Sequence, residues 1–253
     1  MSTTKSSVQV LGVIPARLAS TRLARKPLRL ICGRPMIIWV YQRARQARVL
    51  DDLLVATDAE EIYRCCTDNH IPVVMTAAEH HSGTDRLVEV MRRRPAEIYV
   101  NIQGDEPMIT AEHIELLLRP FRDRPGTAVS TLKVPLPLEP ARHPSNVKVV
   151  TDLAGRALYF SRAVIPHERG GSGQACYYKH LGLYAYTAAA LTQFQALAPS
   201  PLEQLEQLEQ LRFLENGIAI VVMETAQDTV GVDTEEDLQK VEEYFRRLDA
   251  GDA

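Results

Sequence analysis

Short apolar runs alternate with segments of helical spacing through the first half of the chain. The apolar runs have the length of buried strands, and the segments between them carry apolar residues three and four positions apart. We predict strands at 8–14, 53–57, 71–75 and 98–102, and helices at 35–49, 59–69, 84–93 and 110–118. Strands that alternate with helices are typical of a parallel sheet covered on both faces and joined by right-handed crossovers.

The pattern changes after about residue 119, where strands follow one another through short links. We predict strands at 128–134, 146–151, 156–160 and 178–186, with a hairpin turn at 152–155. In the last of these strands Leu181, Leu183 and Ala185 alternate with His180, Gly182 and Tyr184. The glycine-rich stretch 167–174 predicts a mobile loop. We therefore expect one domain over 1–253 that contains a smaller mixed β lobe at about 120–190.

Leucines recur every three residues at 202, 205, 208 and 211. A stripe of that spacing drifts around a helix of 3.6 residues per turn, so we interpret 201–215 as one surface helix with a broad apolar face. A strand at 218–223 and an amphipathic helix at 234–248 follow. Thr234 and Asp237 suit the N-cap and the third position of this last helix.

Composition limits the classes of protein that fit. The 253 residues are 45% hydrophobic and 24% charged, which is typical of a folded domain that needs no disulfides. The net charge of −3 argues against a general nucleic-acid binder, so an anionic ligand needs a local cationic cluster. The four cysteines match neither a zinc site nor a disulfide framework. We see no secretory signal and no apolar run near the roughly 20 residues of a membrane span, and expect a cytoplasmic protein.

A cationic loop follows the first predicted strand. Its charged residues are Arg17, Arg22, Arg25, Lys26, Arg29 and Arg34. Loops after the strands of an α/β sheet lie at the edge where ligands bind, and guanidinium groups suit the oxygens of a triphosphate. The loop contains neither a Walker A motif nor a dinucleotide fingerprint. Charge alone leaves a solvated basic loop equally open.

Two acids stand out because each follows or precedes a predicted element directly. Asp105 follows the fourth strand within Gln103-Gly104-Asp105, where the glycine permits close backbone approach and the carboxylate offers oxygen ligands suited to Mg²⁺. Asp233 precedes the last helix. If the two converge, they form a pair that could hold one or two magnesium ions against phosphates. Spacing does not establish convergence, and a turn carboxylate and a spare capping acid remain the alternatives.

Other polar positions are less specific. Thr84 is expected to cap the helix at 84–93. Arg162 follows a hairpin strand, and His180 lies inside a strand, where a lone histidine is more often packed or solvated than functional. A His-Ser-Asp triad stays open, but no nucleophile elbow supports it.

The motifs taken in order resemble one family over nearly the whole chain, from about residue 8 to residue 245. They include IPAR (14–17), STRL (20–23), KPL (26–28), SGTDR (82–86), NIQGDEP (101–107), FSRAVIP (160–166), KHLGLYAY (179–186), LEQLR (208–212) and GVDT (231–234). Each segment alone is weak evidence, whereas the ordered set resembles the 3-deoxy-manno-octulosonate (Kdo) cytidylyltransferase family.

The resemblance implies a Rossmann-like nucleotidyltransferase fold of the α/β class, with a mostly parallel central sheet flanked by helices and a smaller mixed β lobe. It further implies a homodimer, a requirement for Mg²⁺ and a place in lipopolysaccharide biosynthesis. The substrates would be CTP and a small anionic sugar acid, whose anomeric hydroxyl attacks the α-phosphorus and releases pyrophosphate. Nucleic acid and membrane are not expected partners.

Site residues follow from the resemblance position by position. The catalytic set would be Arg17, Arg22, Lys26, Asp105 and Asp233, of which the two aspartates hold the metal. The nucleotide would also contact Pro15, Ala16, Ser82, Thr84, Arg86 and Gln103. The sugar acid would contact Gln103, Arg162, His180, Tyr184 and Glu206 or Glu209. We identify no dedicated general base.

One departure from the family pattern lies in the cationic loop. The Pro-Gly pair of the family is replaced by Ala24-Arg25. The missing glycine removes easy access to positive φ and suggests a different loop path, and Arg25 adds a cation. The change leaves open a second acceptor, such as a phosphonate acid. A nucleotide-binding homologue without activity is a third hypothesis.

Overall fold

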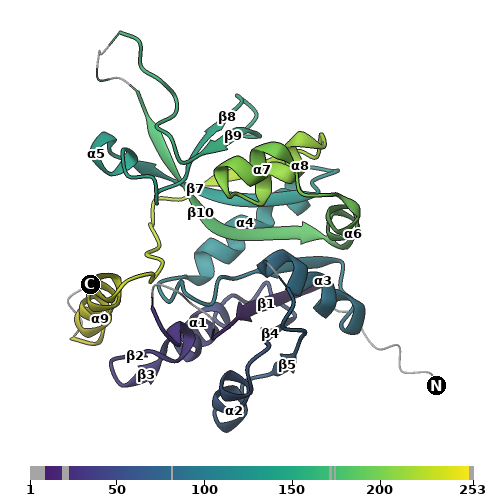
Figure 1. Ribbon diagram of the computed structural model, residues 1–253, viewed down its shortest axis with the longest axis vertical. Coiled ribbons are helices and arrows are strands. Elements are labelled where there is room, and N and C mark those ends of the chain that lie inside the picture. Colours follow the sequence, from purple (N-terminus) through teal and green to yellow (C-terminus); the bar gives the residue numbers. More distant parts are fainter. Residues whose placement is uncertain (1–8, 19–22, 81, 171–172, 174, 251–253) are drawn as a thin grey trace. The chain divides into compact units, whose positions relative to one another are not determined.

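Parallel strands form the sheet of the N-terminal half, in the order β6–β1–β4–β5. Figure 1 labels β1, β4 and β5 of this sheet. The computed structural model describes residues 9–18, 23–80, 82–170, 173 and 175–250. By internal contacts the chain divides into two compact units, residues 1–114 with 229–253 and residues 115–228. The lobe expected at about 120–190 falls inside the second unit, and the expectation of a single domain stays a prediction.

The first unit holds the predicted β-α alternation. Its elements are β1 (Val10–Ala16), the 3-10 turn η1 (Lys26–Leu28), β2 (Leu30–Ile31), β3 (Arg34–Pro35), α1 (Met36–Ala44), β4 (Asp52–Thr57), α2 (Glu60–Asp68), β5 (Val73–Met75), α3 (Gly83–Arg93), β6 (Ile98–Asn101) and α9 (Glu235–Ala250), and the unit boundary falls within α4 (Ala111–Asp123). Val13, Ile14, Leu54 and Val55 are fully buried, as strands covered on both faces require. The parallel sheet is confirmed.

Two local predictions were wrong. Ser82, not Thr84, caps α3, because its hydroxyl accepts a hydrogen bond from the Asp85 amide at 3.1 Å. Thr84 is 3% exposed and lies inside the helix. The helix expected at 35–49 ends at Ala44, because residues 45–48 continue with polar side chains and little apolar surface to bury.

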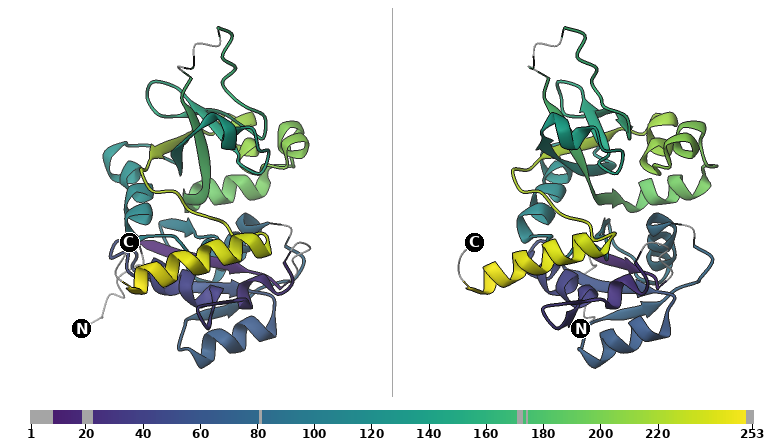
Figure 2. Two further views of the ribbon diagram at one scale, coloured as in Figure 1. Left: turned by 90° about the vertical axis from the view of Figure 1, so that its left-hand side faces the viewer. Right: turned by 60° about the vertical axis from the view of Figure 1, so that its left-hand side comes forward.

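The last helix, α9, begins as predicted. Thr234 Oγ1 accepts from the Asp237 amide at 3.2 Å, and Asp237 Oδ2 accepts from the Thr234 amide at 3.1 Å. Its apolar face packs on β2 and α1, and Phe245 lies 4.2 Å from Trp39 between ring centroids (Figure 2, yellow helix). This packing fixes the start of α9 and therefore the residue just before it, Asp233.

The second unit contains a mixed sheet in the order β11–β7–β10–β8–β9, in which β11 and β7 are parallel and the other pairs are antiparallel. Its elements are β7 (Val129–Leu136), α5 (Leu138–Ala141), β8 (Lys148–Thr151), β9 (Ala157–Ser161), β10 (Tyr177–Thr187), α6 (Ala188–Ala196), α7 (Pro201–Glu206), α8 (Gln210–Glu215) and β11 (Ile220–Glu224). The hairpin turn is confirmed, because the Gly155 amide donates to the Asp152 carbonyl and Gly155 has φ of 76°.

The simple alternation expected along β10 was wrong. The pairing with β7 shifts register between Leu181 and Tyr184, and Tyr184 and Tyr186 are buried as well as Leu183 and Ala185. A register shift turns side chains toward the opposite face. Tyr186 then stacks on Phe213 of α8. The face of β10 that the alternation would expose to solvent is therefore covered by this helix.

The leucine repeat forms two helices and not the single helix predicted. The chain turns at Gln207, whose φ is 54°, and α7 and α8 lie side by side next to β9 (Figure 1). Leu208 and Leu211 are buried, whereas Leu205 is 79% exposed. Because a three-residue stripe drifts around a straight helix, the turn brings the later leucines back to the core. Within the described residues, every helix is too short or too polar to cross a membrane.

Candidate functional site

Two distant carboxylates meet at one lysine in the first unit. Lys26 Nζ lies 2.6 Å from Asp105 Oδ2 and 2.8 Å from Asp233 Oδ1. The lysine side chain is 13% exposed and the two carboxylates are 35% and 40% exposed. The convergence that spacing could not establish is therefore present, and both acids keep a face toward solvent.

Backbone contacts bring the two acids together. A Cβ added to Gly104 would lie 2.7 Å from the Pro15 carbonyl oxygen, so only glycine lets the turn after β6 lie this close to β1. The Val232 amide donates to the Asp105 carbonyl at 2.9 Å. Buried Glu106 accepts from Thr229 Oγ1 at 3.1 Å. These ties hold the segment before α9 against the turn that carries Asp105.

Opposing effects act on the ammonium of Lys26. Burial lowers its pKa, but the attraction and hydrogen bonds of Asp105 and Asp233 outweigh burial, and the pKa is raised above its ordinary value. The lysine is thus a fixed positive charge. It neutralises part of the charge of the carboxylate pair.

The carboxylate pair has the donor chemistry that magnesium prefers. Mg²⁺ is bound through one or two carboxylates, keeps several waters and takes further oxygens from phosphates, at about 2.1 Å. Both acids already contact a single cation, and both are partly exposed. In the described part of the chain, no three or more metal-binding side chains gather at one place. Asp105 and Asp233 therefore fit Mg²⁺ that shares its coordination with water and phosphate.

The cationic loop is partly described. Arg17 follows β1 and is exposed, whereas Arg22 lies outside the described residues. Arg25 has φ of 56°, the left-handed region that glycine enters without strain, and its guanidinium pairs with Glu61. The loop thus reaches positive φ despite the missing glycine. Pro15 and Ala16 end β1 beside this loop.

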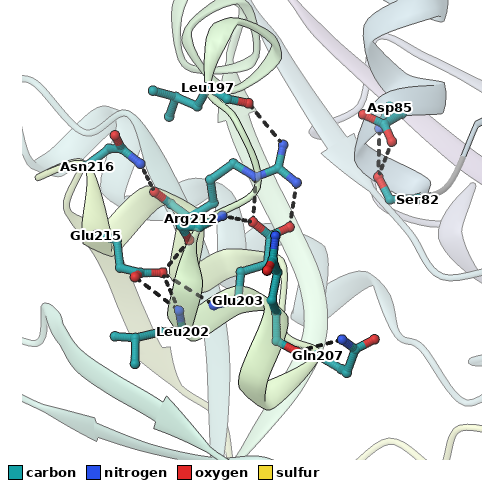
Figure 3. Close-up of polar contacts among 11 residues, drawn as sticks. Ser82, Asp85, Leu197, Leu202, Glu203, Gln207, Arg212, Glu215 and Asn216 are labelled. Atoms are coloured by element: carbon teal, nitrogen blue, oxygen red, sulfur yellow. Dashed lines mark hydrogen bonds and ion pairs between the residues drawn. The ribbon is translucent and has the colours of Figure 1, made fainter.

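The residues expected near the base of a nucleotide lie at the start of α3. Ser82 contacts Asp85 there (Figure 3). Arg86 is 3% exposed and donates to Asp58 Oδ2 at 2.8 Å and to Thr76. Sequence reasoning missed Asp58, which directly follows the strand β4. Arg86 is held by protein groups, and its contact with a nucleotide stays a prediction, as does that of half-buried Gln103.

Two further predicted residues contact each other in the second unit. The Glu206 carboxylate accepts from Ser161 Oγ at 2.5 Å and from the Arg162 amide at 2.9 Å. Arg162 Nε donates to the Glu206 carbonyl at 2.8 Å, and Nη1 donates to the Pro144 carbonyl at 3.2 Å. The structure joins β9 to the end of α7 through this pair. Their contact with a sugar acid stays a prediction.

Lys148 is a residue that sequence reasoning missed. Its side chain is fully buried, and Nζ donates to the carbonyls of His143, Asn146 and Arg162 at 3.3, 2.6 and 2.6 Å. Burial lowers its pKa, against the attraction of Glu206. The only available signal was a lysine inside the apolar run VKVV. It anchors the loop before β8 to the residue after β9.

His180 and Tyr184 belong to an aromatic cluster. His180 Nε2 lies 3.0 Å from Thr131 Oγ1, and the ring centroid lies 5.0 Å from that of Phe160 and 5.3 Å from that of Tyr184. Burial raises the pKa of Tyr184 well above its usual value, and nearby Tyr186 and Glu209 raise it further. Within the described residues, Gln210 Nε2 is buried without a hydrogen-bond partner. The Tyr184 hydroxyl lies near Thr131, whose hydrogen bond acts to lower its pKa, so of these two buried atoms Gln210 Nε2 is the one left to a polar ligand.

Acid should destabilise the protein through His180. Burial, with a smaller contribution from Lys179, lowers its pKa from 6.5 to about 3. Between these values the unfolded chain binds a proton that the folded protein does not, so stability falls as the pH falls through this window. Between about pH 6.5 and about pH 4 the free energy of unfolding should fall by about 3 kcal/mol from this effect alone. Because the His180 side chain is half-buried and not fully buried, we expect roughly 2 kcal/mol.

Urea unfolding near neutral pH and near pH 4 measures this loss, and His180→Gln should lose roughly 2 kcal/mol less than the parent protein. Equal losses in the two proteins would show that His180 does not carry the acid sensitivity.

Known proteins share both the sequence and the fold. Residues 11–224 match the family model described as cytidylyltransferase. Two relatives named 3-deoxy-manno-octulosonate cytidylyltransferase, from Acidobacterium capsulatum and Koribacter versatilis, are 54% and 50% identical over 240 residues. Each alignment covers 95% of this chain, and 98% and 91% of the respective relative.

A solved structure matches almost the whole molecule. It is described as CMP:2-keto-3-deoxy-manno-octonic acid synthetase complexed with CTP, and it is 44% identical with a TM-score of 0.91. The match covers 95% of this chain and 99% of that one. A cytidylyltransferase from Leptospira borgpetersenii has the same fold at 15% identity, with a TM-score of 0.61.

Proposed function

The chain belongs to the cytidylyltransferase family, and from this membership we propose that it transfers CMP from CTP to the anomeric hydroxyl of Kdo or a close analogue, with release of pyrophosphate. The relatives that carry the Kdo activity in their names align over nearly their full length. The observation that carries the chemistry is the meeting of Asp105 and Asp233 at Lys26. These two acids and the lysine, which come from distant segments, would neutralise charge on the phosphates during the transfer.

We assign Mg²⁺ to Asp105 and Asp233. When bound, the ion supplies charge neutralisation at the phosphates and a lower pKa for the attacking hydroxyl. Lys26, Arg17 and Arg22 bind the triphosphate, whose charge they balance and whose orientation they fix. The hydrogen bond from the Val232 amide to the Asp105 carbonyl keeps the two carboxylates close enough to bind one ion. The nucleotide also contacts Pro15, Ala16, Ser82, Thr84, Arg86 and Gln103.

We assign the acceptor to polar residues of the second unit. The buried Gln210 Nε2 supports this assignment, because it has no hydrogen-bond partner among the described residues and a sugar acid offers hydroxyl groups that would accept from it. His180 contributes a neutral imidazole, since its pKa of about 3 keeps it uncharged near neutral pH. Glu206 and Arg162 shape the site from β9 and α7, and Glu209 lies at the start of α8. A homodimer, a cytoplasmic location and a role in lipopolysaccharide biosynthesis belong to the same proposal.

The test is release of pyrophosphate from CTP with magnesium and each candidate acid. We expect release with Kdo or its 8-amino analogue and none when the acid is omitted. Release with a phosphonate acid but not with Kdo would show that the acceptor is the phosphonate acid. If CTP binds but none of the acids leads to pyrophosphate release, the result would favour the nucleotide-binding homologue without activity.

A further inference from the structure

Lys26 occupies the oxygens that a divalent ion needs. Its ammonium contacts Asp105 Oδ2 and Asp233 Oδ1, and it is the least exposed member of the three. The same carboxylates are the metal ligands assigned above. An ammonium ion and a divalent cation repel each other at such short range, and they compete for the same lone pairs. Both cannot lie between the two carboxylates at once.

The surroundings explain why the lysine lies between the two acids. Two carboxylates side by side repel each other, so a positive charge between them removes an unfavourable interaction. The neighbouring cations have partners of their own, because Arg25 pairs with Glu61 and Arg29 pairs with Glu235. Among the contacts of the described residues, Lys26 is the cation that pairs with both Asp105 and Asp233.

A bound triphosphate changes this balance. Its oxygens offer the ammonium new anionic partners, and its charge attracts the divalent ion to the carboxylates. The exchange needs only a side-chain rotation of a flexible lysine stem.

We propose that Lys26 is a resident counter-ion that keeps divalent metal off Asp105 and Asp233 until the phosphates of a nucleotide draw the ammonium away. The inference rests on the metal site of the proposed function. It adds a binding order, in which free metal binds weakly and metal enters with the nucleotide. Such coupling is reciprocal, so the metal in turn strengthens nucleotide binding.

Binding of Mn²⁺ to the nucleotide-free protein tests this, with electron paramagnetic resonance of free Mn²⁺ as the readout. The parent protein should bind weakly, and Lys26→Met should bind at least about tenfold more tightly. Arg29→Gln removes a cation of equal charge three residues away, and should bind as weakly as the parent. Asp105→Asn added to Lys26→Met should abolish the gain.

The melting temperature gives a second readout. Added Mn²⁺ should raise the melting temperature of Lys26→Met clearly and that of the parent little, because a ligand stabilises the state that binds it. This comparison uses each variant as its own reference, so an altered fold stability does not obscure it.

Three outcomes would overturn the inference: tight Mn²⁺ binding by the parent, no gain in Lys26→Met, or an equal gain in Arg29→Gln. The first leaves the proposed function intact if Kdo and CTP still yield pyrophosphate. Failure of the proposed function appears separately, as absence of pyrophosphate at saturating magnesium and CTP.

Discussion

Asp105→Asn is expected to lower turnover with CTP and Kdo at least about a hundredfold. The amide keeps the shape of the carboxylate but loses the negative charge that we assign to binding Mg²⁺ and that faces Lys26 at 2.6 Å. Steady-state pyrophosphate release measures the loss. Because the carboxylate is 35% exposed, we expect the free energy of unfolding to change by no more than about 1 kcal/mol.

Glu235→Gln is the matched control for Asp105→Asn. Glu235 is also an acid paired with a cation of the same loop, Arg29, but it is 52% exposed and contacts neither Lys26 nor Asp233 in the contacts described. Its turnover should stay within about twofold of the parent. If Asp105→Asn keeps full turnover, Asp105 is not the metal ligand, and the mechanism built on the carboxylate pair fails.

Glu203→Gln should have the largest effect on stability, a loss of about 3–5 kcal/mol. Glu203 and Arg212 form a buried ion pair whose side chains are 10% and 13% exposed (Figure 3). Glu203 Oε2 accepts from Arg212 Nε at 2.7 Å and from the Ser200 amide at 3.0 Å, which closes a capping box on α7. Neutralising Glu203 removes the carboxylate that pairs with this buried guanidinium. Urea unfolding measures the loss.

Glu243→Gln gives the comparison that isolates burial. It removes the same charge from an ion pair with Arg247 on α9, where the side chains are 63% and 66% exposed. An exposed pair of this kind contributes about 0.5 kcal/mol or less. Equal losses in Glu203→Gln and Glu243→Gln would mean that the α7–α8 network adds nothing beyond an ordinary surface pair.

Periodicity predicted most elements, because alternation of strands and helices is a local property of the sequence. β4 and α2, for example, begin and end within one residue of the predicted bounds. The break at Gln207 could not be predicted, since a repeat that looks like one helix gives no sign of where the chain turns to bury Leu208 and Leu211. Tertiary packing decided that position.

The candidate site divides in the same way. The types of residue at strand ends pointed to phosphate and metal chemistry. The meeting of Asp105 with Asp233 depends instead on contacts between distant segments, among them the hydrogen bonds from Val232 to Asp105 and from Thr229 to Glu106. Lys148 was missed because no sequence pattern marks a buried lysine whose ammonium donates three hydrogen bonds to backbone carbonyls. Contacts of that kind are a property of the folded backbone.

The first unit is discontinuous, since residues 229–250 return to it after the whole second unit has been made. During synthesis Lys26 and Asp105 therefore emerge from the ribosome long before Asp233 and α9 are made. A nascent chain that lacks residues 229–250 contains Asp105 but not Asp233. The apolar residues of β2 and α1 are then not covered by α9. Catalytic competence would thus arise abruptly, once residues 229–250 have been synthesised.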